Sequence, residues 1–369
     1  MDEFYLKLFT LHLLIMTTQQ IEKWPLIIAG PCSAETEEQT VETCRQLADS
    51  GLVHMLRAGA WKPRTQPGCF EGSGLLGLSW IAKAKQQTGL PAGVEVATSK
   101  HVESALEFGM EMVWLGARTV GNPFSVQDVA DALRGSDVLV LIKNPMNPDL
   151  ELWSGAVARL LNVGLKPEQL GLIHRGFSFY GHGAYRNPPM WHLALEMQSR
   201  FPDIRMICDP SHICGNRHRI SEISQKAADL RYDGLMIESH IDPSKALSDA
   251  SQQLTPAALI SLLNTIRWRK SSVDNPEFTD ALDKLRGRID QIDTELFELL
   301  SRRMKISERI GEVKKANNVA ILQGSRWSSI TERITLQAGE LNLNPEFVKT
   351  ILEAIHIESI NRQNEVMNK

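Results

Sequence analysis

Several features that mark special classes of protein are scarce in this sequence. It has five cysteines among 369 residues, an odd number without the spacing of a disulfide framework, which predicts reduced thiols in a cytoplasmic protein. The net charge of −4 provides no overall basic surface, so we expect neither nucleic acid nor a membrane as a partner. With 43% hydrophobic and 23% charged residues, the composition is that of a globular protein. The length predicts one large domain and a smaller one.

The hydrophobic run near the N-terminus is too short to cross a bilayer. It extends from Phe4 to Met16 and is interrupted by Lys7 and His12. It also lacks the basic start and the small-residue cleavage site of a signal peptide. We therefore expect residues 1–25 to be an N-terminal extension without a targeting role, or the product of a start codon upstream of Met16.

Short apolar runs alternate with longer helical patterns between residues 26 and 270. Such alternation is typical of βαβ units around a parallel sheet. Eight candidate strands fit a closed barrel better than an open doubly wound sheet, and no GxGxxG motif follows the first strand. The predicted fold is therefore α/β, a (β/α)8 TIM barrel, with strands at 26–29, 54–57, 93–96, 112–115, 138–143, 171–174, 205–208 and 234–238.

The alternation stops after residues 271–278, which have the composition of a linker. The side chains that follow predict one helix from about Thr279 to Asn317 by their 3-4-3-4 spacing. A helix of that length cannot bury its apolar stripe within a small domain, so we expect a homodimer through this region. Two more helices, near 326–338 and 345–367, complete a predicted all-α domain at 279–369. The stripe consists of Leu282, Leu285, Ile289, Ile292, Leu296, Leu299, Arg303, Ile306, Ile310 and Val313.

Chemically active side chains gather where the predicted strands end. In a (β/α)8 barrel the functional residues lie at this edge. Basic residues recur there, which predicts anionic substrates with phosphate and carboxylate groups, although each one alone could form a surface salt bridge. The positions are Cys32, Arg57, Lys62, Arg64, Glu95, Arg118, Lys143, Arg175, Asp209, His212 and Glu238.

Part of this set suits a divalent metal. A thiolate, an imidazole and two carboxylates bind Mn, Fe, Co or Zn, and these donors come from Cys32, His212, Glu238 and Asp249. Taken alone, a buried cysteine is more often a small apolar residue, and a loop histidine is more often merely hydrogen-bonded. Two further cysteines flank the histidine and are weaker alternatives as ligands, Cys208 and Cys214.

Eight strings of residues in this region form a series. In order they are AGPCS (29–33), LRAGAWKPRT (56–65), LGAR (115–118), IKNP (142–145), HRGF (174–177), CDPSH (208–212), IESH (237–240) and ALSDASQQLT (246–255). The series resembles 3-deoxy-D-arabino-heptulosonate-7-phosphate (DAHP) synthase of type I-beta, and KPRT is its most diagnostic part. The resemblance implies a barrel enzyme that condenses phosphoenolpyruvate with erythrose 4-phosphate in the first step of the shikimate pathway.

The resemblance also implies roles for single residues. It assigns a divalent metal, manganese first and otherwise cobalt, iron or zinc, to Cys32, His212, Glu238 and Asp249. It assigns phosphoenolpyruvate to Arg57, Lys62, Arg118, Lys143 and Arg175. Erythrose 4-phosphate would contact the KPRT stretch, chiefly Arg64 and Thr65, and Lys62 would donate a proton to the new alkoxide.

Two residues and one short stretch bear on how well the resemblance holds. Trp114 and His174 differ from residues common in the family, and we expect both to alter the lining while leaving the arginine ligands in place. The related 3-deoxy-manno-octulosonate-8-phosphate synthase resembles KANRS where this chain has KPRT at residues 62–65. The heptulosonate reaction is therefore favoured over the octulosonate reaction.

The C-terminal region carries a second resemblance. The strings LRGRIDQIDTELFELLSRRMKISERIGEVKK (285–315) and ESINRQ (358–363) are similar to AroQ-class chorismate mutases, which convert chorismate to prephenate without a cofactor. The family implies catalytic roles for Arg303, Lys314 and Gln363, and substrate binding by Ser359, Arg326 and, from the partner subunit, Arg286. The usual D-x-x-R-E pattern reads QGSRW at 323–327, which predicts a weakened or reshaped pocket.

Other interpretations stay open at this point. From residue chemistry alone, Arg303 in an apolar stripe could serve an interhelical salt bridge or lie where the stripe reaches the surface. The helical domain could be only a dimeriser and a sensor of prephenate or chorismate, and the barrel could be a different metal-dependent enzyme. About 25 residues precede the first strand, so we expect feedback regulation, if present, to act through the C-terminal domain.

Overall fold

A computed structural model describes residues 24–62, 68–180, 183–270, 272–322, 330, 333–334 and 338–368. The chain divides into two compact units, Met1–Ser271 and Ser272–Lys369. Nearly all of the expected N-terminal extension lies outside the described residues. No described helix is long and apolar enough to span a membrane.

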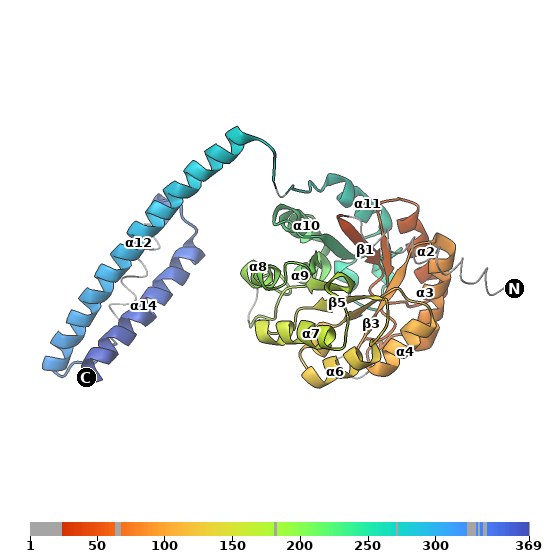
Figure 1. The fold of residues 1–369 in the computed structure, drawn as a ribbon, viewed down its shortest axis with the longest axis horizontal. Coiled ribbons are helices and arrows are strands. Elements are labelled where there is room, and N and C mark those ends of the chain that lie inside the picture. The colour runs from red at the N-terminus through yellow and green to blue at the C-terminus, as the bar shows by residue number, and fades with distance from the viewer. Residues whose placement is uncertain are drawn as a thin grey trace. The chain divides into compact units, whose positions relative to one another are not determined.

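The first unit is a closed barrel of parallel strands, which confirms the predicted fold (Figure 1). Strands pair in sequence order, and the last strand returns to the first, with Ile28 opposite Met236. Every observed strand end lies within one residue of its predicted place. The strands are β1 (Leu26–Gly30), β2 (Met55–Arg57), β3 (Ala92–Val96), β4 (Met112–Leu115), β5 (Leu139–Lys143), β6 (Leu170–His174), β7 (Arg205–Cys208) and β8 (Gly234–Glu238).

Two apolar layers explain why the strands are continuous hydrophobic runs. One set of strand side chains fills the barrel interior, among them Leu26, Met55, Trp114 and Met236. The alternate set faces outward and packs under the helices. Because both faces of each strand are buried, polar residues cannot alternate with apolar ones as they do in a half-exposed sheet. Polar side chains are consequently concentrated at the strand ends, where they form the site.

Helices surround the barrel and connect its strands (Figure 1). In several of them a polar side chain caps the first turn and so defines where the helix begins. Thr98, for example, accepts a hydrogen bond from the His101 amide and starts α4 at Ser99. The helices are α2 (Glu37–Ala48), α3 (Gly74–Thr88), α4 (Ser99–Glu107), α5 (Ala117–Val120), α6 (Pro123–Ala132), α7 (Leu150–Asn162), α8 (Trp191–Arg200), α9 (Pro210–Cys214), α10 (Ile220–Asp229) and α11 (Pro256–Thr265).

The second unit contains two long helices, α12 (Pro276–Ala316) and α14 (Pro345–Asn368). The predicted first helix is present but begins earlier, because Asn275 caps it and Pro276 occupies its first turn. Helix α14 packs against the second half of α12 (Figure 1). Most of the predicted helix near 326–338 lies outside the described residues.

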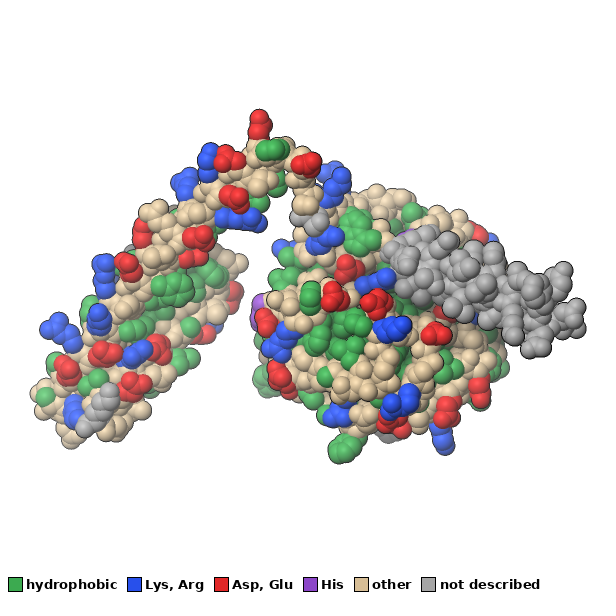
Figure 2. Space-filling model, in the orientation of Figure 1, with side chains coloured by type: hydrophobic (Ala, Val, Ile, Leu, Met, Phe, Trp, Pro, Cys, Tyr) green, Lys and Arg blue, Asp and Glu red, His purple; other side chains and the backbone are tan. Residues whose placement is uncertain are grey.

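Small residues allow the two long helices to approach each other closely. Ser307 and Gly311 of α12 are buried, as are Ser359 and Gln363 of α14. A Cβ atom added at Gly311 would lie 3.1 Å from the Cα atom of Gln363. Elsewhere on α12 the apolar stripe is exposed in this chain, and Figure 2 shows apolar side chains on the surface of the helical unit.

Candidate active sites

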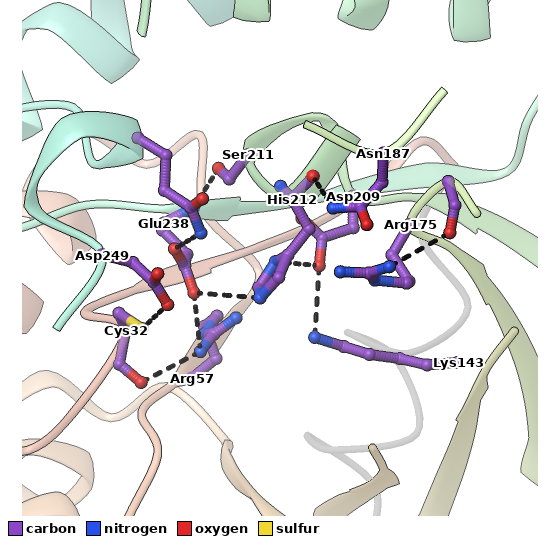
Figure 3. A network of polar contacts seen from close by, with 12 residues as sticks. Cys32, Arg57, Lys143, Arg175, Asn187, Asp209, Ser211, His212, Glu238 and Asp249 are labelled. Atoms are coloured by element: carbon purple, nitrogen blue, oxygen red, sulfur yellow. Dashed lines mark hydrogen bonds and ion pairs between the residues drawn. The ribbon is translucent and has the colours of Figure 1, made fainter. Parts of the chain in front are cut away.

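Three predicted metal ligands converge where the barrel closes. Cys32 follows β1, Glu238 ends the adjacent β8, and Asp249 lies on the loop after β8 (Figure 3). One potential ligand atom from each lies within 4.8 Å of the others. The Cys32 Sγ atom donates to Asp249 Oδ2 at 3.4 Å. The described residues thus contain a cluster that offers a thiol and two carboxylates to a divalent metal.

The fourth predicted ligand, His212, faces this cluster but is not within the same mutual distance. It lies on α9, whose first turn is capped by Asp209. The Oδ2 atom of Asp209 is 2.8 Å from Nδ1 of the imidazole, while Nε2 lies 3.9 Å from Glu238 Oε1. A carboxylate beside one ring nitrogen is the usual way in which proteins orient a histidine toward a metal.

The charges in the cluster suit a cation. Burial, followed by the charge of Glu238, raises the pKa of the Cys32 thiol to about 12. For Glu238, burial opposes ionisation, but the charges of His212 and Arg57 outweigh it and lower the pKa of the carboxyl. Its Oε1 atom accepts no hydrogen bond from the described residues, although Arg57 Nη2 is 3.4 Å away. A divalent metal would stabilise the thiolate and satisfy this oxygen, so the donor set fits the group.

Beside the cluster lies a buried cationic group. Arg57 projects into the barrel, with its guanidinium carbon 4.9 Å from the centre of the Trp114 ring, and donates to the Cys32 carbonyl. Its Nε and Nη1 atoms find no hydrogen-bond partner among the described residues. Buried, unpaired N–H groups are costly unless a ligand accepts from them. The arginine is therefore arranged to bind an anion.

Two further cations share this region. Lys143 at the end of β5 lies 3.3 Å from Asp209 Oδ2. Arg175, directly after β6, is buried, and burial together with repulsion from Arg186 and Arg118 lowers its pKa to about 10, while Asp209 acts in the opposite direction. Like-charged side chains held this close are typical of a phosphate or carboxylate site.

Lys62 and Glu95 connect the anionic and cationic parts of the site. The Lys62 Nζ atom lies 3.1 Å from Cys32 Sγ. Burial would lower the pKa of Lys62, but Cys32 and Glu238 raise it, so the ammonium remains protonated. Glu95 accepts a hydrogen bond from the Trp114 indole at 2.8 Å. Arg118 lies on α5 and is exposed, whereas the predicted sugar-phosphate ligands Arg64 and Thr65 lie outside the described residues.

His174 has a different role from the lining role expected for it. Its ring lies among Phe177, Trp191 and Tyr232, in the layer outside the barrel wall. The Pro189 carbonyl accepts from Nε2 at 2.5 Å, so Nδ1 accepts from the Tyr232 hydroxyl at 2.9 Å. Burial lowers the pKa of His174 to about 4, which keeps the ring neutral.

Two polar side chains that the sequence did not single out bind the carboxylates of this cluster. Arg186, on the loop after β6, donates to Asp249 Oδ1 at 2.8 Å and to Gln252 Oε1 at 2.9 Å. Gln252 in turn donates to Glu238 Oε2 at 2.7 Å. Neither residue stands at a strand end, where a polar side chain is conspicuous after an apolar run. Gln252 does fall within the ALSDASQQLT string.

The helical unit brings together four of the residues predicted there. Arg303 donates to the Ser359 hydroxyl, and Lys314 donates to Gln363 Oε1 at 3.1 Å. No carboxylate among the described residues pairs with Arg303, which disfavours the interhelical salt bridge. Arg286 is bonded only locally in the described contacts, to Asp283, and lies about 25 Å along α12 from Arg303 at 1.5 Å per residue. Arg326 and the departures at 323 and 327 lie outside the described residues.

Comparison with known proteins assigns the family. Residues 20–274 match the model of the DAHP synthetase I family. The chain belongs to this family. Residues 285–364 match the model of chorismate mutase type II, so both resemblances seen in the sequence are confirmed. Members of the DAHP synthetase family generally depend on a divalent metal, and the cluster around Cys32 provides ligands for one.

Individual relatives include enzymes of both reactions that were weighed from the sequence. Phospho-2-dehydro-3-deoxyheptonate aldolase of Thermotoga maritima is 31% identical over 228 residues, which are 62% of this chain and 64% of the relative. A crystal structure of a Thermotoga maritima DAHP synthase superposes with a TM-score of 0.58 at 28% identity and covers 65% of this chain and 67% of that one. A 2-dehydro-3-deoxyphosphooctonate aldolase of Syntrophotalea carbinolica is 29% identical over 251 residues, covering 62% of this chain and 84% of the relative.

Proposed function

We propose that the barrel condenses phosphoenolpyruvate with erythrose 4-phosphate to give DAHP and phosphate, and that the helical unit rearranges chorismate to prephenate. The observation that carries the first activity is the buried Arg57, which has unpaired N–H groups beside a thiol–carboxylate cluster. A phosphorylated carboxylate would supply the acceptors that this arginine lacks.

The proposed reaction follows from where charge lies in the site. Arg57, Lys143 and Arg175 are buried and would hold phosphoenolpyruvate through its phosphate and carboxylate, with Arg118 at the more exposed side. This fixes C3 of phosphoenolpyruvate toward the aldehyde carbon of the sugar phosphate, and a carbon–carbon bond forms between them. Water adds at C2, and the C–O bond to phosphate then breaks to release the anion.

Lys62 is the proposed proton donor in this reaction. The aldehyde oxygen becomes an alkoxide as the carbon–carbon bond forms, and it takes a proton from the Lys62 ammonium. The raised pKa of Lys62 keeps that proton available at neutral pH. Arg64 and Thr65, which follow in the sequence, are the proposed ligands of the erythrose phosphate group.

We infer that a divalent metal binds Cys32, His212, Glu238 and Asp249, with manganese the first candidate and cobalt, iron and zinc the others. When bound, it would supply Lewis acidity toward the aldehyde oxygen of the sugar phosphate. The donor set and the unsatisfied Glu238 oxygen support this assignment.

The decisive experiment measures phosphate release by the full-length protein. Release should require both phosphoenolpyruvate and erythrose 4-phosphate, and it should be much slower with a five-carbon aldose phosphate, the cosubstrate of an octulosonate reaction. Phosphate release from phosphoenolpyruvate alone, or a preference for the five-carbon sugar, would contradict the proposal.

For the helical unit we propose that Arg303, Lys314, Ser359 and Gln363 form one end of a mutase pocket. Arg303 would bind a carboxylate, and Lys314 and Gln363 would stabilise charge on the breaking ether oxygen. Arg286 is too far along α12 to join them within one chain, which supports its entry from a second subunit. Chorismate consumption by the full-length protein tests this; its absence would favour the role of dimeriser and sensor.

We further propose a homodimer through α12. Apolar side chains along this helix, such as Leu285, Ile292 and Leu299, are 56, 61 and 59% exposed in the single chain. A second copy would cover them. The mass of the protein in light scattering would distinguish dimer from monomer. The free thiols of the five cysteines support a cytoplasmic location.

A further inference from the structure

Arg186 joins the loop after β6 to the metal cluster, and neither family resemblance gave it a role. One nitrogen, Nη1, donates both to Asp249 Oδ1 at 2.8 Å and to Gln252 Oε1 at 2.9 Å. Gln252 is fully buried and donates to Glu238 Oε2 at 2.7 Å. The arginine therefore contacts one proposed ligand directly and a second through an amide.

The backbone around Arg186 is fixed by close approaches to neighbouring loops. A Cβ atom on Gly215, which has φ +67°, would lie 2.4 Å from the Arg186 Cβ, and one on Gly176 would lie 2.1 Å from the Asn187 carbonyl oxygen. The Asn187 side chain donates to the His212 carbonyl at 2.7 Å. Residues 186 and 187 thus contact the segments that carry His212 and Asp249 directly. Glycine at 176 and 215 makes room for this.

The two oxygens of Asp249 are divided between two partners. Oδ2 faces Cys32 Sγ at 3.4 Å, and Oδ1 accepts from Arg186. Asp249 also has a left-handed backbone, with φ 47°, which a non-glycine residue adopts only at some cost when other contacts hold it there. The ion pair with Arg186 is such a contact.

Charge balance gives Arg186 a second effect. A thiolate and two carboxylates around a divalent cation leave one net negative charge in a partly buried site. Lys62 and Arg57 lie beside Cys32 and Glu238, and the guanidinium of Arg186 adds a positive charge on the Asp249 side of the cluster. An ordinary surface ion pair contributes little, but here the partner Asp249 side chain is only 18% exposed and Gln252 is buried.

We propose that Arg186 is a positioning residue for the metal: it orients Asp249 and, through Gln252, Glu238, and so couples metal affinity to the loop that begins with Arg175. This inference rests on the proposed metal site. It predicts that Arg186 changes the affinity for the metal itself, whereas a residue that only bound substrate would change the KM for phosphoenolpyruvate.

The test uses full-length protein stripped of metal with a chelator and titrated with Co²⁺. The readout is the thiolate-to-cobalt charge-transfer absorption that Cys32 would give, measured without substrates. Arg186→Gln should weaken Co²⁺ binding by roughly 10- to 100-fold, as loss of a residue that orients a ligand usually does. Arg186→Lys, which keeps the charge and the donors, should recover most of the affinity. The metal-free variants should still unfold cooperatively, at most a few degrees below the wild type, because Arg186 is half exposed.

Arg217→Gln is the matched control. Arg217 donates to the Ala250 carbonyl at 2.8 Å and so contacts the loop after β8 that carries Asp249, but it forms no ion pair with a proposed ligand among the described residues. The Arg217→Gln variant should bind Co²⁺ as the wild type does. An equal loss in this variant would show that any anchor of the loop suffices and would overturn the specific role of Arg186.

Other outcomes would also overturn the proposal. Wild-type Co²⁺ affinity in Arg186→Gln would do so, and a raised KM for phosphoenolpyruvate with that affinity would assign Arg186 to the substrate instead. An Arg186→Lys variant as weak as Arg186→Gln would remove the role of the charge. If the wild type showed no charge-transfer band, the proposed metal site would fail, and the role of Arg186 with it.

Discussion

Replacing Gly311 by alanine should impair the mutase more than it impairs the fold. The added Cβ atom would lie 3.1 Å from the Cα and 3.2 Å from the carbonyl oxygen of Gln363, and backbone atoms cannot swing away as a side chain can. The two helices must therefore separate by a few tenths of an ångström. That movement lengthens the 3.1 Å contact between Lys314 and Gln363, both of which we place at the ether oxygen.

The magnitude follows from opposing effects. Alanine gains about 1 kcal/mol of helix propensity over glycine, whereas overpacking costs about 1–3 kcal/mol. The net loss of stability is then roughly 0–2 kcal/mol. Because a misplacement of 1 Å can cost about 100-fold in rate, a shift of a few tenths should cost on the order of tenfold in kcat. Chorismate consumption gives the rate, and thermal unfolding followed by circular dichroism gives the stability.

Gly287→Ala provides the matched control on the same helix. Nothing lies within 4 Å of a Cβ atom there, and Gly287 is on the face of α12 opposite the apolar stripe. This variant should gain roughly 1 kcal/mol of stability and keep the wild-type rate. If Gly311→Ala behaved in the same way, close approach of the helices would not be required, and the argument from Gly311 would be wrong.

Further predictions address both units. Cys32→Ala should abolish phosphate release and weaken metal binding by orders of magnitude while chorismate turnover stays intact; wild-type phosphate release after metal titration would refute the assignment. Arg303→Ala should abolish mutase activity with an unchanged or slightly raised melting temperature, and a collapse of both would make Arg303 structural. Because Gln363 does not titrate, mutase kcat should vary little with pH near neutrality, whereas a steep profile would require another titrating group. In the unfolded chain the pKa of His174 is near its ordinary value of 6.5, whereas burial lowers it to about 4 in the folded barrel. Protonation therefore favours the unfolded chain, and the free energy of unfolding should fall by about 2 kcal/mol through this group as pH falls from 7 to 5. Urea unfolding at the two pH values should show a smaller loss in His174→Asn, and an equal loss would exclude His174 as the cause. Prephenate should inhibit the synthase in the full chain but not in a truncation ending at Lys270; inhibition that persists would place the sensor in the barrel.

The strands were predictable because their burial is simple. In a parallel barrel each strand is covered on both faces, so the whole strand is an uninterrupted apolar run in the sequence, as in Leu26–Gly30. Charged residues can enter only at the ends of these runs. For the same reason Arg57, Lys143 and Glu238 are recognisable as candidate site residues from the amino-acid sequence.

Loop residues in the site were not predictable in the same way. Arg186 lies well past the end of β6, and its place depends on the close approach of Gly215 and Gly176 to residues 186 and 187. Gln252 has no charge to mark it. The outward position of His174 depends on which alternate set of β6 faces the interior, and a fully apolar strand does not reveal that.

The position of the cluster where the barrel closes has a consequence for when the site forms during folding. The thiol of the cluster lies just after the first strand, and its carboxylates lie at the end of the last strand and on the loop that follows, with Cys32 and Asp249 217 positions apart in the sequence. An unfolded chain, or one whose synthesis has not yet reached β8, therefore holds no such site. A cation selective for the closed barrel stabilises it by mass action, about 2.7 kcal/mol at a free concentration 100 times Kd. With metal bound at the proposed ligands, metal supply would therefore affect the stability of the folded barrel as well as its chemistry.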